Sequence, residues 1–197
     1  MALSWVVSCA YLHMDLHPHL TRANNFMTTD FLIFATCDLC DTFKSDTPGT
    51  VNALPVLWRS FGKRASWAGP VATVQCVDDN SLVKAFVESP GLGRVLVVDG
   101  GASMARGLLG GNLGSAAASN GWAGVLVNGC VRDVAELAQC DVGIFALASN
   151  PMPTNRQNLG VRDVPVCIGG HWIYPGDWLY ADADGVVVSR QPIHIQQ

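Results

Sequence analysis

Charged side chains are scarce in this sequence. Asp, Glu, Lys and Arg together make up 14% of the 197 residues, and the formal net charge is -4. A protein that binds nucleic acid usually carries a marked excess of basic residues, so we expect no direct nucleic-acid binding. Only two of the 16 acidic residues are glutamates, Glu88 and Glu136. The others are aspartates, which favour turns, helix caps and metal sites over exposed helix faces.

Long apolar segments are lacking too. The apolar run at residues 3–12 is shorter than the roughly 20 residues that a membrane-spanning helix needs, and it has no preceding Lys or Arg of the kind found in secretory signals. We therefore expect no membrane association and a cytoplasmic location. Residues 1–27 differ in character from the rest of the chain. We interpret them as an N-terminal extension, and residues 28–197 as a single domain.

Paired cysteine motifs are nearly absent. The chain has seven cysteines, an odd number that does not indicate a disulfide framework. Cys76, Cys130 and Cys167 lie in apolar runs and are expected to be buried free thiols. Cys37 and Cys40 form one CxxC motif, but no second pair follows at a spacing that suits zinc. A redox function of this pair is one alternative for the chain.

Apolar residues and glycines are plentiful by contrast. Hydrophobic residues make up 49% of the chain, and there are 20 glycines. Such a composition excludes a mainly disordered protein. With so little charge, the chain is expected to bury more surface than one small domain needs, for example against copies of itself.

Strand and helix patterns alternate through the middle of the chain. Apolar and β-branched runs predict strands at 69–77, 94–98, 124–127 and 143–148. Helices are predicted at 36–44, 82–88, 113–120 and 131–139, and a loop at 46–55. Short strands separated by turns follow at 164–168, 171–174 and 185–189. The pattern predicts an α/β fold with a parallel component and an antiparallel tail.

Two glycine-rich loops are suited to ligand binding. Asp99-Gly100-Gly101 follows a predicted strand, and the segment 110–114 (GGNLG) precedes a predicted helix. Glycines let the backbone approach an anion, and a helix N-terminus presents free N–H groups. Plain turn geometry would also explain the glycines. Neither loop has the spacing of a dinucleotide-binding motif.

Arg132 and Asp133 come after the predicted strand 124–127, at the expected start of a helix. Arginine can bind a carboxylate through two hydrogen bonds, and aspartate can hold a hard cation. Together they would suit a small α-keto acid chelated to a metal. Aspartate is also a common N-cap residue, so a purely structural function of Asp133 stays open. His171 is interpreted as a strand residue rather than a base.

Three blocks of the sequence resemble the RraA-like family: residues 61–76 (FGKRASWAGPVATVQC), 93–137 (beginning GRVLVVDGGASMARGLLGGNL) and 171–189 (HWIYPGDWLYADADGVVVS). This family includes regulators of ribonuclease E activity and metal-dependent 4-hydroxy-4-methyl-2-oxoglutarate aldolases. The resemblance implies a compact α/β/β sandwich of the swivelling phosphohistidine-domain type, usually assembled as a homotrimer.

The resemblance also implies a class II aldolase that releases pyruvate, with oxaloacetate decarboxylation as a side reaction. In such aldolases the glycine segment and an arginine contact the keto acid, and the next aspartate holds the metal. The matching substrate-binding positions here are Gly110, Gly111, Asn112, Leu113 and Arg132. Arg132 and Asp133 would be the catalytic pair, with Asp133 as the ligand of Mg²⁺ or Mn²⁺.

The chain departs from the aldolase pattern at one point. Many aldolases of the family carry a further acidic residue near the start of the helix, where this chain has Gly111 and Asn112. Regulators without aldolase activity tend to lose the acidic residue after the arginine, and its presence as Asp133 favours the enzyme. The alternative is a non-catalytic regulator that binds and inhibits a ribonuclease E-type enzyme.

Overall fold

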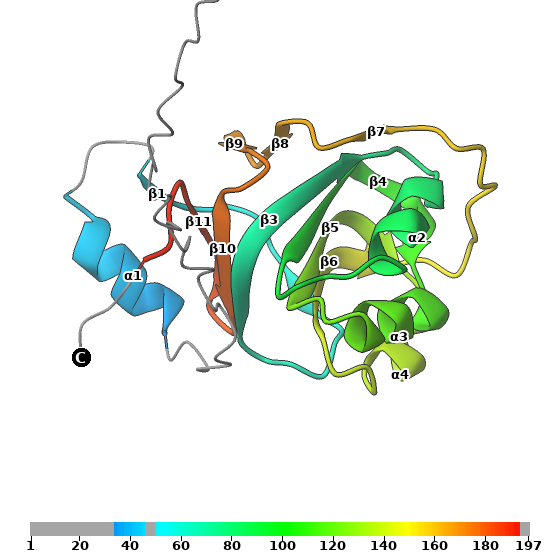
Figure 1. Ribbon diagram of the computed structural model, residues 1–197, viewed down its shortest axis with the longest axis horizontal. Helices are drawn as coiled ribbons and strands as arrows, with labels where there is room; N and C mark the ends of the chain where they lie inside the picture. Colours follow the sequence, from blue (N-terminus) through cyan, green and yellow to red (C-terminus); the bar gives the residue numbers. More distant parts are fainter. Residues whose placement is uncertain (1–33, 46–49, 194–197) are drawn as a thin grey trace, which may run out of the picture. The chain divides into compact units, whose positions relative to one another are not determined.

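The computed structural model describes residues 34–45 and 50–193, which belong to one compact unit (Figure 1). The predicted N-terminal extension at 1–27 lies outside the described residues. None of the helices in these two described ranges is long and apolar enough to cross a membrane.

Most of the strands form one mixed sheet in the order β1-β11-β10-β3-β4-β5-β6-β2, and β7 pairs with β3. The bounds are β1 Val51–Ala53, β2 Arg59–Ser60, β3 Trp67–Gln75, β4 Val95–Leu109, β5 Gly124–Val131, β6 Gly143–Ser149, β7 Val161–Arg162, β10 Trp178–Asp182 and β11 Gly185–Ser189. A separate antiparallel hairpin consists of β8, Val166–Ile168, and β9, His171–Ile173. The mixed α/β architecture predicted from the sequence is confirmed.

Strand β3 belongs to both halves of the sheet. Its residues 67–70 pair antiparallel with β10, and its residues 71–75 pair parallel with β4. Strands β4, β5 and β6 continue the parallel half. The strand therefore carries the chain from the antiparallel layer into the parallel one. The parallel component and the antiparallel tail were both predicted from the sequence.

Each face of the parallel strands has its own core. Helices α2 (Ser81–Val87), α3 (Gly111–Ser119) and α4 (Val134–Leu137) cover one face, where Leu96, Val125 and Ile144 are fully buried (Figure 1). Antiparallel strands cover the other face, against Val97 and Leu126. Strands buried on both sides read as continuous apolar runs, which explains the uniformly apolar segments of the sequence.

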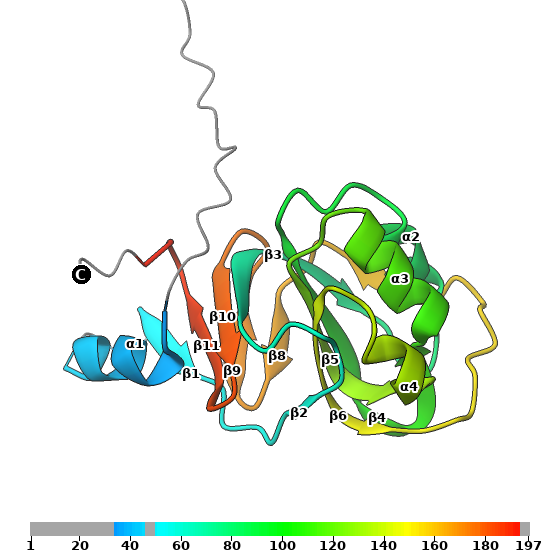
Figure 2. The ribbon, with the colours of Figure 1, turned by 90° about the horizontal axis from the view of Figure 1, so that it is seen from below.

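Helix α1, Thr36–Phe43, packs on β1, β10 and β11 rather than on the parallel strands (Figure 2). Leu39 is fully buried there beside Tyr180 and Val187. The carboxylate of Asp182 accepts hydrogen bonds from the backbone N–H and the hydroxyl of Thr36, both at 2.7 Å. A side chain of β10 thus supplies the cap that the sequence next to the helix lacks.

The prediction of a turn at Asp99-Gly100-Gly101 was wrong. Strand β4 continues through this segment to Leu109, and its pairing with β5 shifts register between Asp99 and Ser103 and again beyond. Gly101 and Ala102 adopt positive φ angles of 63° and 55°. These angles take up the extra residues as a bulge, so pairing resumes instead of ending.

The predicted helix 131–139 is mostly not helical. Strand β5 extends to Val131, which pairs with Leu109 and Ser149 on either side, and the helix is confined to α4. Strands β1 and β10 were missed by the sequence patterns, β1 within the predicted loop. Both pair with β11, so the partner strand and not local propensity makes them strands.

The described cysteines are all free thiols, in line with the expectation of no disulfide framework. Cys76 and Cys130 are buried as predicted, whereas the prediction for Cys167 was wrong. Because side chains alternate along a strand, Cys167 points to solvent while its neighbours Val166 and Ile168 face the core.

The indole of Trp67 lies across a pair of glycines at the beginning of two neighbouring strands. Gly124 of β5 is in register with Gly143 of β6. A Cβ atom on either glycine would lie 2.1 Å from a ring atom of Trp67. The ring also contacts Phe145 edge-on, with the centroids 5.5 Å apart. Only glycine allows the tryptophan to pack this closely on the sheet.

We expect Gly124→Ala to destabilise the fold by about 2 kcal/mol or more, because the added methyl group must displace a buried indole. Urea denaturation followed by tryptophan fluorescence measures the change. Ser60→Ala, on the exposed strand β2, is the matched control and should alter stability by less than about 0.5 kcal/mol. Equal stability of Gly124→Ala and the parent protein would contradict this packing.

Candidate functional site

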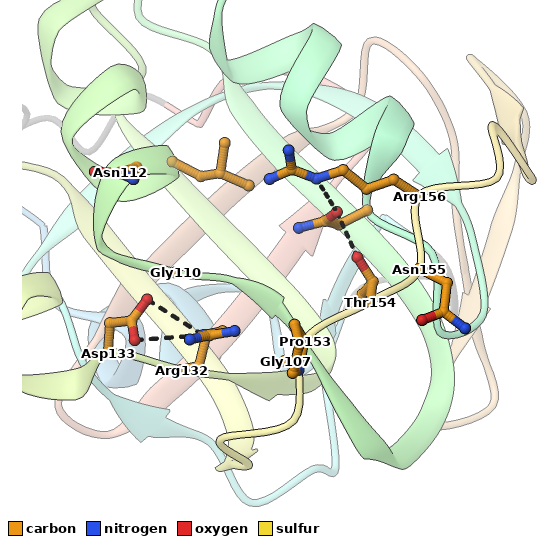
Figure 3. Close-up of a pocket in the computed structure, with 11 residues that line it drawn as sticks. Gly107, Gly110, Asn112, Arg132, Asp133, Pro153, Thr154, Asn155 and Arg156 are labelled. Atoms are coloured by element: carbon orange, nitrogen blue, oxygen red, sulfur yellow. Dashed lines mark hydrogen bonds and ion pairs between the residues drawn. The ribbon is translucent and has the colours of Figure 1, made fainter.

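A cavity of about 430 Å³ lies where β4 and β5 end (Figure 3). Four segments contribute to it: the residue before α2, the end of β4 with the first turn of α3, the turn between β5 and α4, and the chain that follows β6. The lining residues are Asn80, Gly107, Gly110, Asn112, Leu113, Arg132, Asp133, Pro153, Thr154, Asn155 and Arg156. A volume of this size suits a small organic ligand.

The structure brings the predicted site residues together. Gly110, Asn112, Leu113, Arg132 and Asp133 all line the cavity. The backbone N–H of Gly111 donates a hydrogen bond to Oδ2 of Asp133 at 3.3 Å. Residues from two loops more than 20 positions apart therefore form one group, because parallel strands β4 and β5 end side by side. The other glycine-rich segment, at Asp99, does not contribute to the lining.

Asp133 is the residue that turns the chain from β5 into α4. Its backbone is left-handed, with φ 56° and ψ 45°, a conformation that aspartate tolerates better than most residues. Although it occupies the N-cap position, its side chain makes no capping hydrogen bond. The carboxylate is instead directed at Gly111 and at Arg132, whose Nε lies 3.3 Å from it. The structural alternative therefore accounts for the backbone of Asp133 but not for its carboxylate.

Gly107 and Gly110 have no side chains, and this leaves room for Arg132 and Asp133 to approach the backbone. A Cβ on Gly107 would lie 2.9 Å from Cβ and Cγ of Arg132. A Cβ on Gly110 would lie 2.6 Å from Oδ2 of Asp133. These glycines are needed for close approach. Plain turn geometry, the other interpretation of the sequence, does not explain these contacts.

The chemistry of Asp133 suits a magnesium-type cation. Its side chain is 35% exposed, so water can reach the carboxylate. Among the described residues, no group of three or more His, Cys, Asp or Glu side chains could form an all-protein metal cage. Mg²⁺ usually binds to only one or two carboxylates and completes its coordination with water and substrate oxygens. A single aspartate at the edge of an open cavity fits that requirement, whereas a zinc site would need more ligands.

A second carboxylate, which the sequence analysis missed, lies beside the same turn. Glu136 of α4 packs against Gly111 so closely that a Cβ on Gly111 would lie 1.8 Å from its Oε2. The next helix thus places a carboxylate against position 111, although Glu136 is not among the residues that line the cavity. The signal was present in the sequence as one of only two glutamates, three residues after Asp133.

The segment after β6, residues 150–160, is here called the strap. It contains no helix or strand and was not predicted to take part in the site. Several hydrogen bonds fasten it across the cavity. The backbone N–H of Gly107 donates to the Met152 carbonyl at 2.9 Å, and Arg106 donates to the Pro153 carbonyl at 2.6 Å.

Buried Asp79 holds the middle of the strap. Its carboxylate accepts hydrogen bonds from the backbone N–H groups of Ser81 and Gln157. Burial raises the pKa of Asp79, but these hydrogen bonds outweigh that effect and lower it overall. The ionised form of Asp79 is therefore the one that ties the strap to the start of α2.

The CxxC motif does not have the properties of a redox site. Cys37 and Cys40 lie on α1, far along the chain from the cavity residues. The negative charge of Asp184 raises the pKa of Cys37, and burial raises that of Cys40. Reactive thiols of oxidoreductases need lowered pKa values, so the surroundings of Cys37 and Cys40 do not favour the redox alternative.

Comparisons with known proteins agree on one family. Residues 36–188 match the RraA-like family, described as Aldolase/RraA. A protein of Albidiferax ferrireducens, provisionally named a 4-hydroxy-4-methyl-2-oxoglutarate aldolase, is 56% identical over 164 residues, which is 79% of this chain and 95% of that protein.

Two solved structures are similar to this chain in both fold and sequence. The RNA-processing inhibitor RraA from Thermus thermophilis has a TM-score of 0.77 and 41% identity, over 82% of this chain and 96% of that chain. A structure from Geobacillus kaustophilus, titled S-adenosylmethionine:2-dimethylmenaquinone methyltransferase, has a TM-score of 0.76 and 38% identity, over 81% of this chain and 97% of that one.

Acidification should release the strap. Because the pKa of Asp79 is lower in the folded protein, its contribution is complete above the unfolded value of about 3.9 and is lost as pH falls through the folded value. Amide exchange, expressed as protection factors, should show Gln157 protected down to about pH 4 and losing protection below it. Asp79→Asn should lose this protection at neutral pH, whereas Asp163→Asn, at an exposed residue, should keep it. Unchanged protection in Asp79→Asn would contradict the assignment.

Proposed function

This chain belongs to the RraA-like family, and on that basis we propose that it is a divalent-metal-dependent aldolase. The reaction is cleavage of 4-hydroxy-4-methyl-2-oxoglutarate into two molecules of pyruvate, with decarboxylation of oxaloacetate as a side activity. The single observation that carries the proposal is the pair of Arg132 and Asp133, held at the cavity by the Gly110-Gly111 turn. The names of the similar proteins describe different activities. The substrate is taken from relatives named as aldolases, and the site supports that choice over the other names.

Arg132 and the start of α3 would bind the pyruvate half of the substrate. The guanidinium group is permanently charged and can donate two parallel hydrogen bonds to a carboxylate. Helix α3 begins directly after Gly110, and the N–H groups at the start of a helix have no partner within the helix. Both features favour negative charge at the same place in the cavity.

Asp133 would hold Mg²⁺ or Mn²⁺, and the cation when bound supplies polarisation of the keto oxygen. Arg132 would meet the next requirement of the reaction, which is to stabilise the negative charge of the product enolate. Breaking the carbon–carbon bond leaves a pyruvate enolate, whose negative charge is stabilised by a cationic group already in place. Loss of carbon dioxide from oxaloacetate gives the same enolate, so one site serves both substrates.

Glu136 is our candidate for the group that holds a proton during the reaction. Its carboxylate lies against Gly111, whose N–H contacts Asp133. A side chain in that place can accept or return a proton directly or through one water. It would take over the function of the acidic residue that other aldolases of the family carry at the start of the helix.

A homotrimer remains our prediction for the assembly. Several large apolar side chains of the described chain are exposed, among them Leu57 at 92%, Leu92 at 78% and Trp172 at 58%. Scattered exposed apolar residues are normal, but a chain with only 14% charged residues has few means to keep such surface in water. Contact between copies would bury part of it.

A protein-binding regulator of RNA processing is the second candidate. It is favoured by the similarity to the RraA inhibitor of Thermus thermophilis. The two functions can be separated, because a binding surface for a ribonuclease does not require an Arg132–Asp133 pair in the lining of a cavity.

We expect Asp133→Asn and Arg132→Gln each to lower pyruvate release from oxaloacetate by roughly 100-fold or more. Loss of Asp133 removes the cation ligand, and loss of Arg132 removes stabilisation of the enolate. A chelator should abolish the activity of the parent protein, and added Mg²⁺ should restore it. The control Asp141→Asn alters a carboxylate that pairs with Arg64 at the surface and should retain full activity. Rates equal to the background of metal alone would sink the enzyme proposal.

Glu136→Gln should lower the same rate by roughly 100-fold while leaving binding of the keto acid nearly unchanged, since a proton carrier acts on kcat. Glu88→Gln, at the other glutamate, is the matched control, because Glu88 lies at the end of α2, whereas Glu136 packs against Gly111 beside Asp133. Full activity in Glu136→Gln would show that the second carboxylate is dispensable.

A further inference from the structure

The cavity contains a second arginine that the function described so far does not use. Arg156 extends into the cavity from the strap, whereas Arg132 comes from the end of β5 (Figure 3). The two guanidinium groups thus belong to separate segments of the same site. A site for a single carboxylate needs only one of them.

Arg156 is held in position by the buried side chain of Asn80. Its Nε donates to Oδ1 of Asn80 at 3.3 Å, and the same oxygen accepts a hydrogen bond from the Thr154 hydroxyl at 2.6 Å. Asn80 is only 7% exposed, so its amide oxygen is a rigid anchor. Because this anchor uses Nε, the two terminal nitrogen atoms of the guanidinium group are left for a ligand.

The backbone of Arg156 is also constrained. Its φ is 46°, in the left-handed region that residues other than glycine and asparagine seldom adopt. The fastening of Gln157 to Asp79 holds this conformation on one side. Of the described non-glycine residues with a positive φ, Arg156 and Asp133 are the two that line the cavity.

Arg156 supplies the uncompensated charge of the cavity. Three charged side chains line it, Arg132, Asp133 and Arg156. Arg132 and Asp133 form an ion pair, while Arg156 has no carboxylate within ion-pair distance in the described part of the chain. The remaining polar lining residues are neutral amides and a hydroxyl. Arg156 is exposed to solvent, and it offers this unpaired positive charge to an anionic group of a ligand in the cavity.

We propose that Arg156 binds the distal carboxylate of the substrate and makes the site selective for keto acids with two carboxylates. This inference rests on the proposed function, in which Arg132 takes the carboxylate next to the keto group. In 4-hydroxy-4-methyl-2-oxoglutarate the distal carboxylate belongs to the half that leaves as the second pyruvate. Arg156 thus binds and orients that half, and Asn80 positions Arg156.

Two ligands of equal chain length test the proposal. 2-Oxoglutarate carries the distal carboxylate and lacks the hydroxyl group required for cleavage, whereas 2-oxopentanoate differs only in ending with a methyl group. Titration calorimetry of the full chain with Mg²⁺ should show 2-oxoglutarate binding about 10-fold or more tightly than 2-oxopentanoate. Arg156→Gln should abolish this preference without weakening 2-oxopentanoate, and Arg156→Lys should retain part of it.

Arg59→Gln is the matched control, because it removes one positive charge from the exposed strand β2, outside the cavity lining. It should keep the preference of the parent protein. A preference that survives in Arg156→Gln, or equal affinity of the parent protein for both ligands, would overturn the assignment of Arg156 and leave the proposed aldolase intact. Failure of the parent protein to bind either keto acid would overturn both.

Discussion

The contact between Asp133 and the Gly110-Gly111 turn is the interaction on which the site depends. It joins the start of α3 to the start of α4 across the ends of two parallel strands, and it is possible only because Gly107 and Gly110 have no side chains. The same contact sets the direction of Arg132, which pairs with Asp133. A packing requirement at the end of the sheet and the placement of the chemical groups are therefore one constraint, since any change that separates the two turns also separates the charges.

The strap completes the cavity and is held in place by hydrogen bonds to other elements rather than by strand or helix structure of its own. It has no regular structure, and its own residues are mostly exposed. Its order comes from polar groups of other elements, above all the buried Asp79 and Asn80 at the start of α2. Hydrogen bonds to a buried carboxylate are strong because the charge is shielded from water. A segment fastened in this way can present Arg156 to a ligand, which an unattached loop of polar residues could not do.

The scarcity of charge that marks the sequence takes on a specific meaning in the fold. Apolar side chains fill most of both faces of the parallel sheet, and the few charged residues at its edge stand out against them. One of the two glutamates and a pair of oppositely charged residues meet at the same turn. Because the cavity lining contains few other charges, Arg132 and Asp133 act on a bound ligand with little competition.

Much of the architecture could be predicted from the sequence, because continuous apolar runs and glycine-bounded helices follow from local chemistry. The core strands, helices α1, α2 and α3, and the grouping of Gly110, Asn112, Arg132 and Asp133 belong to that part. Pairing between distant segments decided the rest. Strands β1 and β10 form because each pairs with β11. Strands β4 and β5 continue beyond their apolar segments because each satisfies the backbone hydrogen bonds of the other. Glu136 and Arg156 come close to the site only when α4 and the strap are folded onto it. A sequence states which groups a chain carries. Which of them meet depends on contacts across tens or hundreds of residues, and these form only in the folded chain.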